Sequence, residues 1–284
     1  MVVAIVTDSA ADLPPAEADT AGIRVVPLTV SFGDQSFRAG VDLSTEQFWA
    51  RMTAPDAPFP TTAAASPGAF QVAFQEAFDA GAEAIVYVGV AGSLSGTIKS
   101  AHIARDLFPG RNIYVIDSRS ASMAVGVLAL LGAERAAAGV SAPDIAAELE
   151  LRTADTDFYV VLETLDYLVR GGRLSGTRAA IGTLLSMKPI LTIRDGVVEQ
   201  ADRVRTRSKA RERILELMAT RPVERLAILH AGDVPDIDQF RLEVVERVPG
   251  GIDPAHVTTQ LIGASIGPHV GPGAYGGVLL YRRD

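Results

Sequence analysis

The chain contains no cysteine among its 284 residues, which excludes disulfides, thiolate nucleophiles and thiolate metal sites. Histidine is scarce too, and the four histidines (His102, His230, His256 and His269) lie far apart in the sequence. There is no HExxH and no GxxxxGK[ST] motif, so neither a zinc protease nor a P-loop nucleotide site is predicted. We expect no metal, no cofactor and no ATP hydrolysis by the chain alone.

Excess basic charge and long apolar runs are also missing. The formal net charge is -8, which argues against general nucleic-acid binding and against adhesion to anionic lipid. The short apolar run at the N-terminus has no basic residue before it, unlike a signal peptide. No segment approaches the roughly 20 apolar residues that span a bilayer. We therefore expect a cytoplasmic protein with no stable membrane insertion and no nucleic-acid partner.

The composition is that of an ordinary globular protein, with 48% apolar and 21% charged residues. At roughly 100–200 residues per domain, the length predicts two domains, which we place at 1–156 and 157–284. In the first domain strands alternate with helices, which indicates βαβ units and a mainly parallel sheet. Its strands are expected at 2–7, 24–31 (broken by Pro27), 84–90 and 112–116, and its helices at 46–52, 67–80, 97–107, 120–138 and 142–152.

The second domain has a different pattern, which predicts a mixed α/β sheet. Pro189–Arg194 and Val197–Thr206 are expected to be strands joined by Asp195-Gly196, the strongest short hairpin signal. Further strands are expected at 159–162, 225–230, 255–261 and 277–282, and helices at 164–169, 208–220 and 237–247. The fold class is therefore α/β, with two domains.

Hydroxyl side chains stand close to two predicted helix starts. Ser95 follows a predicted strand and precedes the helix that begins at Thr97, and Thr62 lies shortly before another helix. A helix N-terminus presents free backbone N–H groups and attracts anions, and Gly96 lets the backbone approach closely. The two segments could converge on one carboxylate or phosphate. The alternative is that Ser95 only caps its helix and Thr62 is a turn residue.

The segment 262–277, IGASIGPHVGPGAYGG, is rich in glycine and also carries proline and one histidine. Glycine and proline here predict a fixed irregular loop, and such loops often carry function. His269 supplies a donor that can become cationic near neutral pH. The alternative is an ordinary surface histidine in a turn.

Arginines gather between residues 170 and 207. Because alternating residues of a strand share a face, Arg203, Arg205 and Arg207 could hold a phosphate or an acidic partner. Arg170 and Arg173 flank a glycine pair nearby in the sequence. The alternative is a solvated edge strand protected by its charge.

Several separated motifs, in order along the whole chain, resemble the DegV family of bacterial fatty-acid-binding proteins. They are TDSAADL (7–13), PTTAAASPG (60–68), SLSGTIKSA (93–101), IDS (116–118), LETLDYLVRGGRLSG (162–176), MKPIL (187–191) and IGPHVGPGAYG (266–276). The chain departs from the usual pattern where Ser-Gln-Pro is replaced by Ala63-Ala64-Ala65, and where Tyr-Gln is replaced by Ile98-Lys99. The first change removes a hydroxyl from its loop, and the second is expected to alter the rim of the pocket or the partner surface.

The resemblance implies two α/β domains with a fatty acid between them. It implies a carboxylate site at Thr62 and at Ser95, with Gly96 and Thr97 of the same motif, and with His269 nearby. Some members resemble the lipid-carrying subunit of a bacterial fatty acid kinase, whose separate ATP-binding subunit phosphorylates the bound carboxylate. The family arginines near that face correspond here to Arg173 and Arg205.

Our leading hypothesis is a carrier, not an enzyme, that binds a long-chain fatty acid such as palmitate and presents its carboxylate to a partner kinase. Candidates for the lining of its tail slot, among which the sequence does not decide, are Phe70, Phe74, Ile98, Leu165 and Leu184. A second hypothesis is a serine esterase or thioesterase that uses His269. The G-x-S-x-G elbow of such enzymes is not matched, because Leu94 occupies the central position of residues 92–96. A third is a sugar-phosphate or phosphotransfer enzyme, on fold analogy alone.

Overall fold

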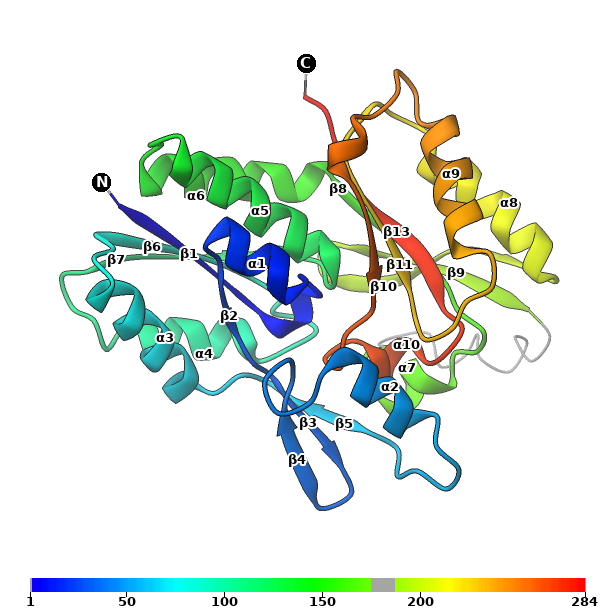
Figure 1. The fold of residues 1–284 in the computed structure, drawn as a ribbon, viewed down its shortest axis with the longest axis horizontal. Coiled ribbons are helices and arrows are strands. Elements are labelled where there is room, and N and C mark those ends of the chain that lie inside the picture. Colours follow the sequence, from blue (N-terminus) through cyan, green and yellow to red (C-terminus); the bar gives the residue numbers. More distant parts are fainter. Residues whose placement is uncertain (1, 175–186, 284) are drawn as a thin grey trace.

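The computed structural model describes residues 2–174 and 187–283. It is an α/β structure with a parallel sheet, a mixed sheet and a small antiparallel sheet (Figure 1). The predicted fold class is therefore confirmed. The candidate tail residue Leu184 and the last two residues of the motif 162–176 lie outside the described residues.

The first sheet is parallel and has the strand order β2-β1-β6-β7. Its strands are β1 (Val3–Asp8), β2 (Arg24–Val26), β6 (Ala84–Gly89) and β7 (Asn112–Asp117). Every residue of β6 is buried, because helices cover both faces of the sheet, as is usual for parallel strands. The helices around it are α1 (Pro15–Ala21), α3 (Pro67–Asp79), α4 (Thr97–Arg105), α5 (Met123–Ala137) and α6 (Ala142–Arg152).

The second sheet is mixed and has the order β10-β9-β8-β13-β11-β12. Its strands are β8 (Thr156–Val161), β9 (Lys188–Arg194), β10 (Val197–Val204), β11 (Val223–His230), β12 (Val257–Leu261) and β13 (Tyr275–Tyr281). Its outer face packs on α8 (Arg207–Met218) and α9 (Ile237–Arg247). Its inner face packs on α5, which lies between the two sheets and shares one hydrophobic core with both (Figure 1).

A third, small sheet has the order β4-β3-β5 and lies below the first sheet in the view of Figure 1. It consists of β3 (Thr29–Phe32), β4 (Gln35–Arg38) and β5 (Thr61–Ala63). Thr62 is therefore a strand residue rather than a turn residue, because it pairs with Val30 in β5. Three short helices complete the structure: α2 (Thr45–Met52), α7 (Asp166–Arg170) and α10 (Gly267–Val270).

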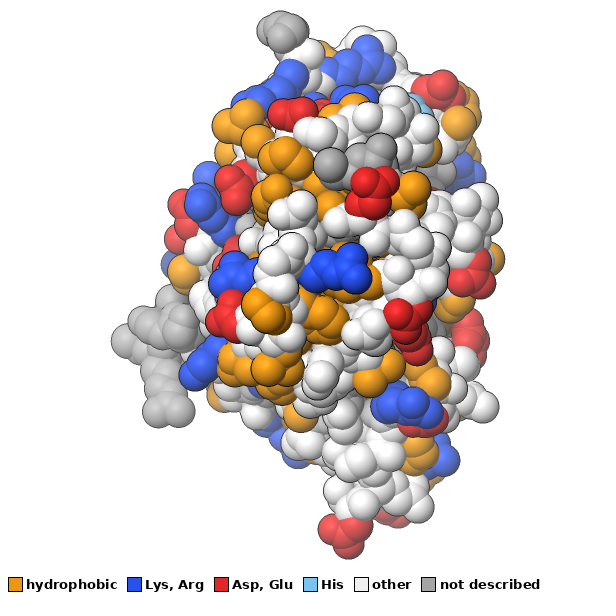
Figure 2. All heavy atoms as spheres, turned by 90° about the vertical axis from the view of Figure 1, so that its left-hand side faces the viewer, with side chains coloured by type: hydrophobic (Ala, Val, Ile, Leu, Met, Phe, Trp, Pro, Cys, Tyr) orange, Lys and Arg blue, Asp and Glu red, His pale blue; other side chains and the backbone are white. Residues whose placement is uncertain are grey.

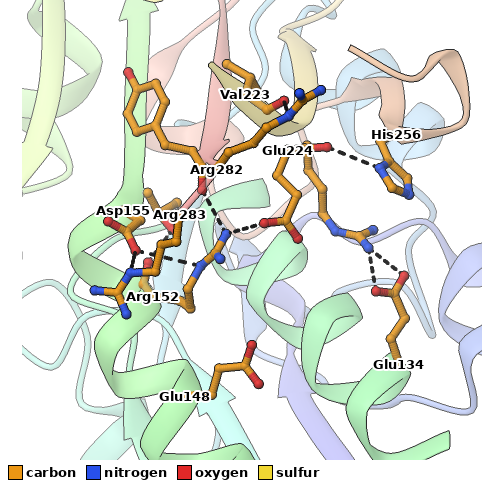
Figure 3. A network of polar contacts seen from close by, with 12 residues as sticks. Glu134, Glu148, Arg152, Asp155, Val223, Glu224, His256, Arg282 and Arg283 are labelled. Carbon is orange, nitrogen blue, oxygen red and sulfur yellow. Dashed lines mark hydrogen bonds and ion pairs between the residues drawn. The ribbon is translucent and has the colours of Figure 1, made fainter. Parts of the chain in front are cut away.

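A network of charged side chains joins the helices of the first sheet to the second sheet (Figure 3). Arg152, buried at the end of α6, donates to the carboxylate of Glu224 at 2.6 Å and to the carbonyl of Tyr281 at 2.9 Å. Arg225 of β11 pairs in turn with Glu134 of α5. Because these ions are held by several partners, the network fixes how the two sheets lie against each other.

The outer surface carries both signs of charge. On the side of the first sheet farthest from the second, Lys and Arg side chains alternate with Asp and Glu among apolar atoms (Figure 2). Mixed charge of this kind gives no extended basic footprint over the described residues of that face. Within residues 2–174 and 187–283, no helix is long and apolar enough to cross a membrane.

Candidate ligand-binding site

An apolar cavity lies between the inner face of the second sheet and the loops of the first. It contains about 740 Å³ of space between atoms, including its open mouth. Its apolar lining consists of Ala10, Leu28, Ala63, Ala64, Val90, Leu94, Ala121, Phe158, Val160, Leu162, Leu168, Leu191, Ile193, Val198, Ile266 and Val270. Its polar side chains include Thr62, Ser95, Arg173 and His269.

The apolar wall follows from strand alternation. Successive side chains of a strand point to opposite faces, so Phe158, Val160 and the adjacent Leu162 face inward while Tyr159 and Val161 face α8. The register places Leu191 of β9 opposite Val160, so both strands present aliphatic side chains to the cavity. An apolar wall of the cavity therefore follows from the two-residue period of the strands.

Carboxylates at the strand ends position the loop that carries Ser95. Asp8, at the end of β1, accepts hydrogen bonds from the backbone N–H of Val90 at 3.0 Å and from the hydroxyl of Tyr87 at 2.7 Å. Asp117, at the end of β7, accepts from the N–H of Gly92 at 3.1 Å. Burial raises the pKa of Asp8, while these donors oppose the rise. The polar residues at the strand ends thus hold the loop rather than line the cavity.

Ser95 enters the cavity beside the start of α4. Its hydroxyl is 2.8 Å from the hydroxyl of Thr97 and accepts from the Thr97 N–H at 3.3 Å. Gly96, not Ser95, is the N-cap of α4, and it makes no side-chain cap. Of the residues predicted here, Ser95 lines the cavity, whereas Thr97 is fully buried behind it and Gly96 faces outward beside Ala64.

Thr62 and His269 meet in the structure, although 207 residues separate them. The Thr62 hydroxyl lies 3.0 Å from His269 Nε2. His269 lies on α10, so the expectation of a wholly irregular loop is wrong at this point. Glycine permits the approach of α7, because a Cβ on Gly171 would lie 2.3 Å from His269 Nδ1. Burial, helped by the charge of Arg173, lowers the pKa of His269 to about 4, so its imidazole is neutral at pH 7.

Arg173 contributes the cation of the site. Its Nε donates to the carbonyl of Leu94 at 3.2 Å, and its Nη1 donates to the carbonyl of Gly171 at 2.7 Å. Among the described residues no carboxylate pairs with it, and burial lowers its guanidinium pKa. A half-buried cation that bonds only to carbonyls leaves donors available for an anion in the cavity.

The predicted arginine face is not formed. β10 ends at Val204, so Arg205 lies in the turn before α8 and Arg207 is the first residue of that helix. Arg207 pairs with Glu163, and Arg205 is exposed and does not line the cavity. Sequence reasoning assigned Arg173 and Arg205 to one face, whereas the structure places only Arg173 beside Thr62, Ser95 and His269.

The proposed tail residues are also elsewhere. Phe70, Phe74 and Ile98 belong to the core between the first sheet and α3 and α4, and Leu165 packs against the main core outside the cavity lining. Sequence reasoning missed the residues that line the cavity, such as Val160 and Leu191. Strand alternation was the available signal, but it could not say which of the two faces would meet the first sheet.

A hydrolytic centre finds no support in the geometry. His269 Nε2 contacts Thr62 rather than Ser95, and among the described residues His269 Nδ1 is buried with no hydrogen-bond partner. A serine triad needs the base bonded to the nucleophile and oriented by a third group. No group of three or more His, Asp or Glu side chains within the described residues could hold a metal ion.

The fold and the cavity define an α/β protein with an amphipathic site between two sheets, and the same arrangement has relatives. Residues 2–282 match the model of the DegV family, which is described as a family of uncharacterised proteins. A DegV domain-containing protein of Streptomyces coelicolor is 37% identical over 284 residues, covering 99% of each chain. A Mycobacterium tuberculosis relative is 36% identical, covering 97% of this chain and 96% of its own. The chain belongs to the DegV family.

Solved structures give the same result in three dimensions. A fatty-acid-binding DegV family protein of Thermus thermophilus superposes with a TM-score of 0.90 at 35% identity, over 99% of this chain and 100% of its own. DegV of Bacillus subtilis, a fatty acid binding protein, gives 0.86 at 32% identity over 98% of each chain. A stearic-acid-binding protein of Eubacterium ventriosum gives 0.87 at 27% identity over 97% of each chain.

Proposed function

We propose that the protein binds a long-chain fatty acid, such as palmitate, in the cavity between its two sheets. The carboxylate lies at Thr62, Ser95, Arg173 and His269, and the hydrocarbon tail follows the inner face of β8 and β9. The observation that carries this proposal is Arg173, a half-buried cation without a carboxylate partner among the described residues, at the polar end of an apolar cavity.

The energetics fit such a ligand. Each buried methylene contributes about 0.8 kcal/mol, so a chain of roughly sixteen carbons reaches about ten kcal/mol before the cost of ordering is subtracted. A carboxylate loses hydration on burial and needs hydrogen bonds in return. Two hydroxyls, an imidazole and a guanidinium supply them here, and the anion also relieves the burial of Arg173.

The relatives support the same ligand class. The structures from Thermus thermophilus and Bacillus subtilis, at 35% and 32% identity over nearly the whole chain, are both described as fatty acid binding. The Eubacterium ventriosum protein is a stearic-acid-binding protein. These proteins bind fatty acids, and the conserved architecture favours the same ligand here.

Two measurements test the proposal. Mass spectrometry of organic extracts from the purified protein should find a co-purified fatty acid. Titration should then show much tighter binding of palmitate than of hexadecanol, which has the same tail but no carboxylate to meet Arg173. A clean extract together with no binding of palmitate would contradict the proposal.

We further propose that the bound carboxylate is presented to an ATP-binding kinase subunit, with Arg205 on the contact surface. Arg205 is exposed and does not line the cavity, so it can meet a partner without contacting the ligand. Arg205→Ala should leave palmitate affinity unchanged and reduce acyl-phosphate formation with a supplied kinase subunit. Loss of palmitate affinity in this variant would contradict this division of roles.

A further inference from the structure

One side wall of the cavity is a hairpin at the edge of the second sheet. Within the described residues β10 pairs only with β9, so the two strands form the outermost ribbon of the sheet. Leu191 and Ile193 of β9 and Val198 of β10 face the cavity. The tail slot is therefore closed on this side by an edge hairpin rather than by the centre of the sheet.

The tip of this hairpin makes a small set of polar contacts with the first sheet, while Ile193 and Val198 behind it pack against the hydrophobic cores. The Ser93 hydroxyl donates to the carbonyl of Gly196 at 2.5 Å, and the Gly196 N–H donates to the carbonyl of Arg119 at 2.9 Å. The Arg119 guanidinium lies 3.6 Å from the carboxylate of Asp195, and both side chains are exposed. We call these contacts the tip latch. Exposed ion pairs and single hydrogen bonds are weak, so the latch opens at modest cost.

The other end of β10 is anchored differently. Asp202 bonds with Arg213 of α8, which also pairs with Glu216 on the same helix. Between Gln200 and Asp202 the pairing with β9 shifts register, which marks a bulge. A bulge bends and twists the strand that contains it, so it provides a bending point between an anchored base and a weakly held tip.

We propose that the β9–β10 hairpin is a side gate of the cavity, which the tip latch holds shut and through which the acyl chain passes. This gate rests on the proposed function, because it matters only if the cavity holds a hydrocarbon chain. When the latch opens, the hairpin bends at its bulge and exposes the slot lined by Leu191, Ile193 and Val198. Closing it again removes the tail from water without moving the carboxylate site.

A reversible crosslink tests the gate, and the cysteine-free chain is well suited to it. A Cβ on Gly196 would lie 3.5 Å from the Ser93 Cβ, within the range for a disulfide. In the double variant S93C/G196C, oxidation should slow both binding and release of a fluorescent fatty acid in stopped-flow experiments, and reduction should restore both rates. The single variants S93C and G196C, under the same oxidant, are the matched controls for the changed side chains.

Opening the latch gives the opposite perturbation. S93A removes one hydrogen bond of the latch and should raise both the association and the release rates by roughly two- to tenfold, while the ratio of the two rates stays nearly constant. E199Q is the control, because Glu199 pairs with Arg194 within the hairpin and not with the first sheet. E199Q should leave both rates unchanged.

The outcomes separate the two proposals. If palmitate binds the unmodified chain and oxidised S93C/G196C exchanges the fluorescent fatty acid as fast as the reduced form, the gate is overturned and the proposed function stands. If the unmodified chain binds no fatty acid, the proposed function and the gate both fall. Slow exchange in the oxidised form only, together with faster exchange in S93A, supports the gate.

Discussion

The hydroxyl of Thr62 gives the sharpest test of the carboxylate site. Thr62 lies on β5, faces the cavity and contacts His269 Nε2 at 3.0 Å. Thr62→Val removes this hydroxyl and keeps the branched shape that suits a strand. The change therefore perturbs one polar contact and leaves the pairing of β5 with β3 in place.

The expected loss follows from the charge of the ligand. A hydrogen bond to a carboxylate contributes about 1.5–3 kcal/mol, so the dissociation constant for palmitate should rise roughly ten- to a hundredfold. The ligand-free protein should also become less stable, by about 0.5–1.5 kcal/mol, because the neutral bond to His269 is lost. Among the described residues that change leaves both ring nitrogens of His269 without a partner.

The neighbouring residue supplies the control. Thr61 is exposed on β5, and alternation turns its side chain away from Thr62. Thr61→Val should change palmitate affinity and the midpoint of denaturant unfolding by little. Isothermal titration and urea unfolding of the two variants measure both quantities. Equal palmitate affinity in Thr62→Val and Thr61→Val would refute the assignment of Thr62 to the carboxylate.

The remaining predictions concern buried charge. In the ligand-free protein the pKa of His269 is lowered to about 4, and a bound carboxylate raises it. Protonation of His269 therefore strengthens binding of the ionised carboxylate, and this gain is lost as pH rises through the ligand-bound pKa of His269. His269→Gln should remove that part of the pH profile in titrations that compare both proteins, and identical profiles would contradict it. Arg173→Met should weaken palmitate binding far more than hexadecanol binding, whereas equal losses would indicate lost packing. Arg152→Met leaves Glu224 without its ion-pair partner and should lower the free energy of unfolding by about 3–5 kcal/mol. The more exposed pair of Arg135 with Glu148 offers the control, with at most about 1 kcal/mol lost in Arg135→Met.

Local signals in the sequence predicted the elements that depend on local chemistry. Asp195 and Gly196 form the turn of the hairpin with φ of 47° and 78°, as the Asp-Gly pair predicts. Ser66 caps α3 by accepting from the Ala69 N–H, as serine before a helix commonly does. The parallel first sheet followed from alternating strands and helices. The domain boundary near residue 156 and the cytoplasmic location stay predictions.

Elements that depend on distant partners were missed. β5 is only three residues long, and it exists because Thr62 finds Val30 of β3, which no pattern within residues 55–63 indicates. α1 was not predicted because Pro15–Ala21 has a single buried side chain, Ala18, and so no apolar period. Short elements of this kind take their stability from tertiary contacts rather than from their own sequence.

The candidate site shows the same limit at the level of single residues. Thr62, Ser95 and His269 were identified by their chemistry, and the structure brings them to one cavity. Arg173 was assigned to a partner surface because an arginine beside a glycine pair gives no sign of burial in the sequence. Its position depends on the carbonyl of Leu94, a backbone acceptor supplied by a loop 79 residues away.

Polar residues at the ends of parallel strands can either bind a ligand or position the loop that follows. Polar residues follow the parallel strands, and ligands often bind at the carboxyl ends of such strands. Asp8 and Asp117 instead accept hydrogen bonds from the backbone N–H groups of Val90 and Gly92, respectively. These hydrogen bonds orient the following loop, so that Ser95 lines the cavity and the carbonyl of Leu94 accepts from Arg173. The proposed anion site is therefore formed by the loop that follows the strand ends and not by the strand-end residues themselves. Only the hydrogen-bond pattern distinguishes the residues that position this loop from those proposed to bind the ligand.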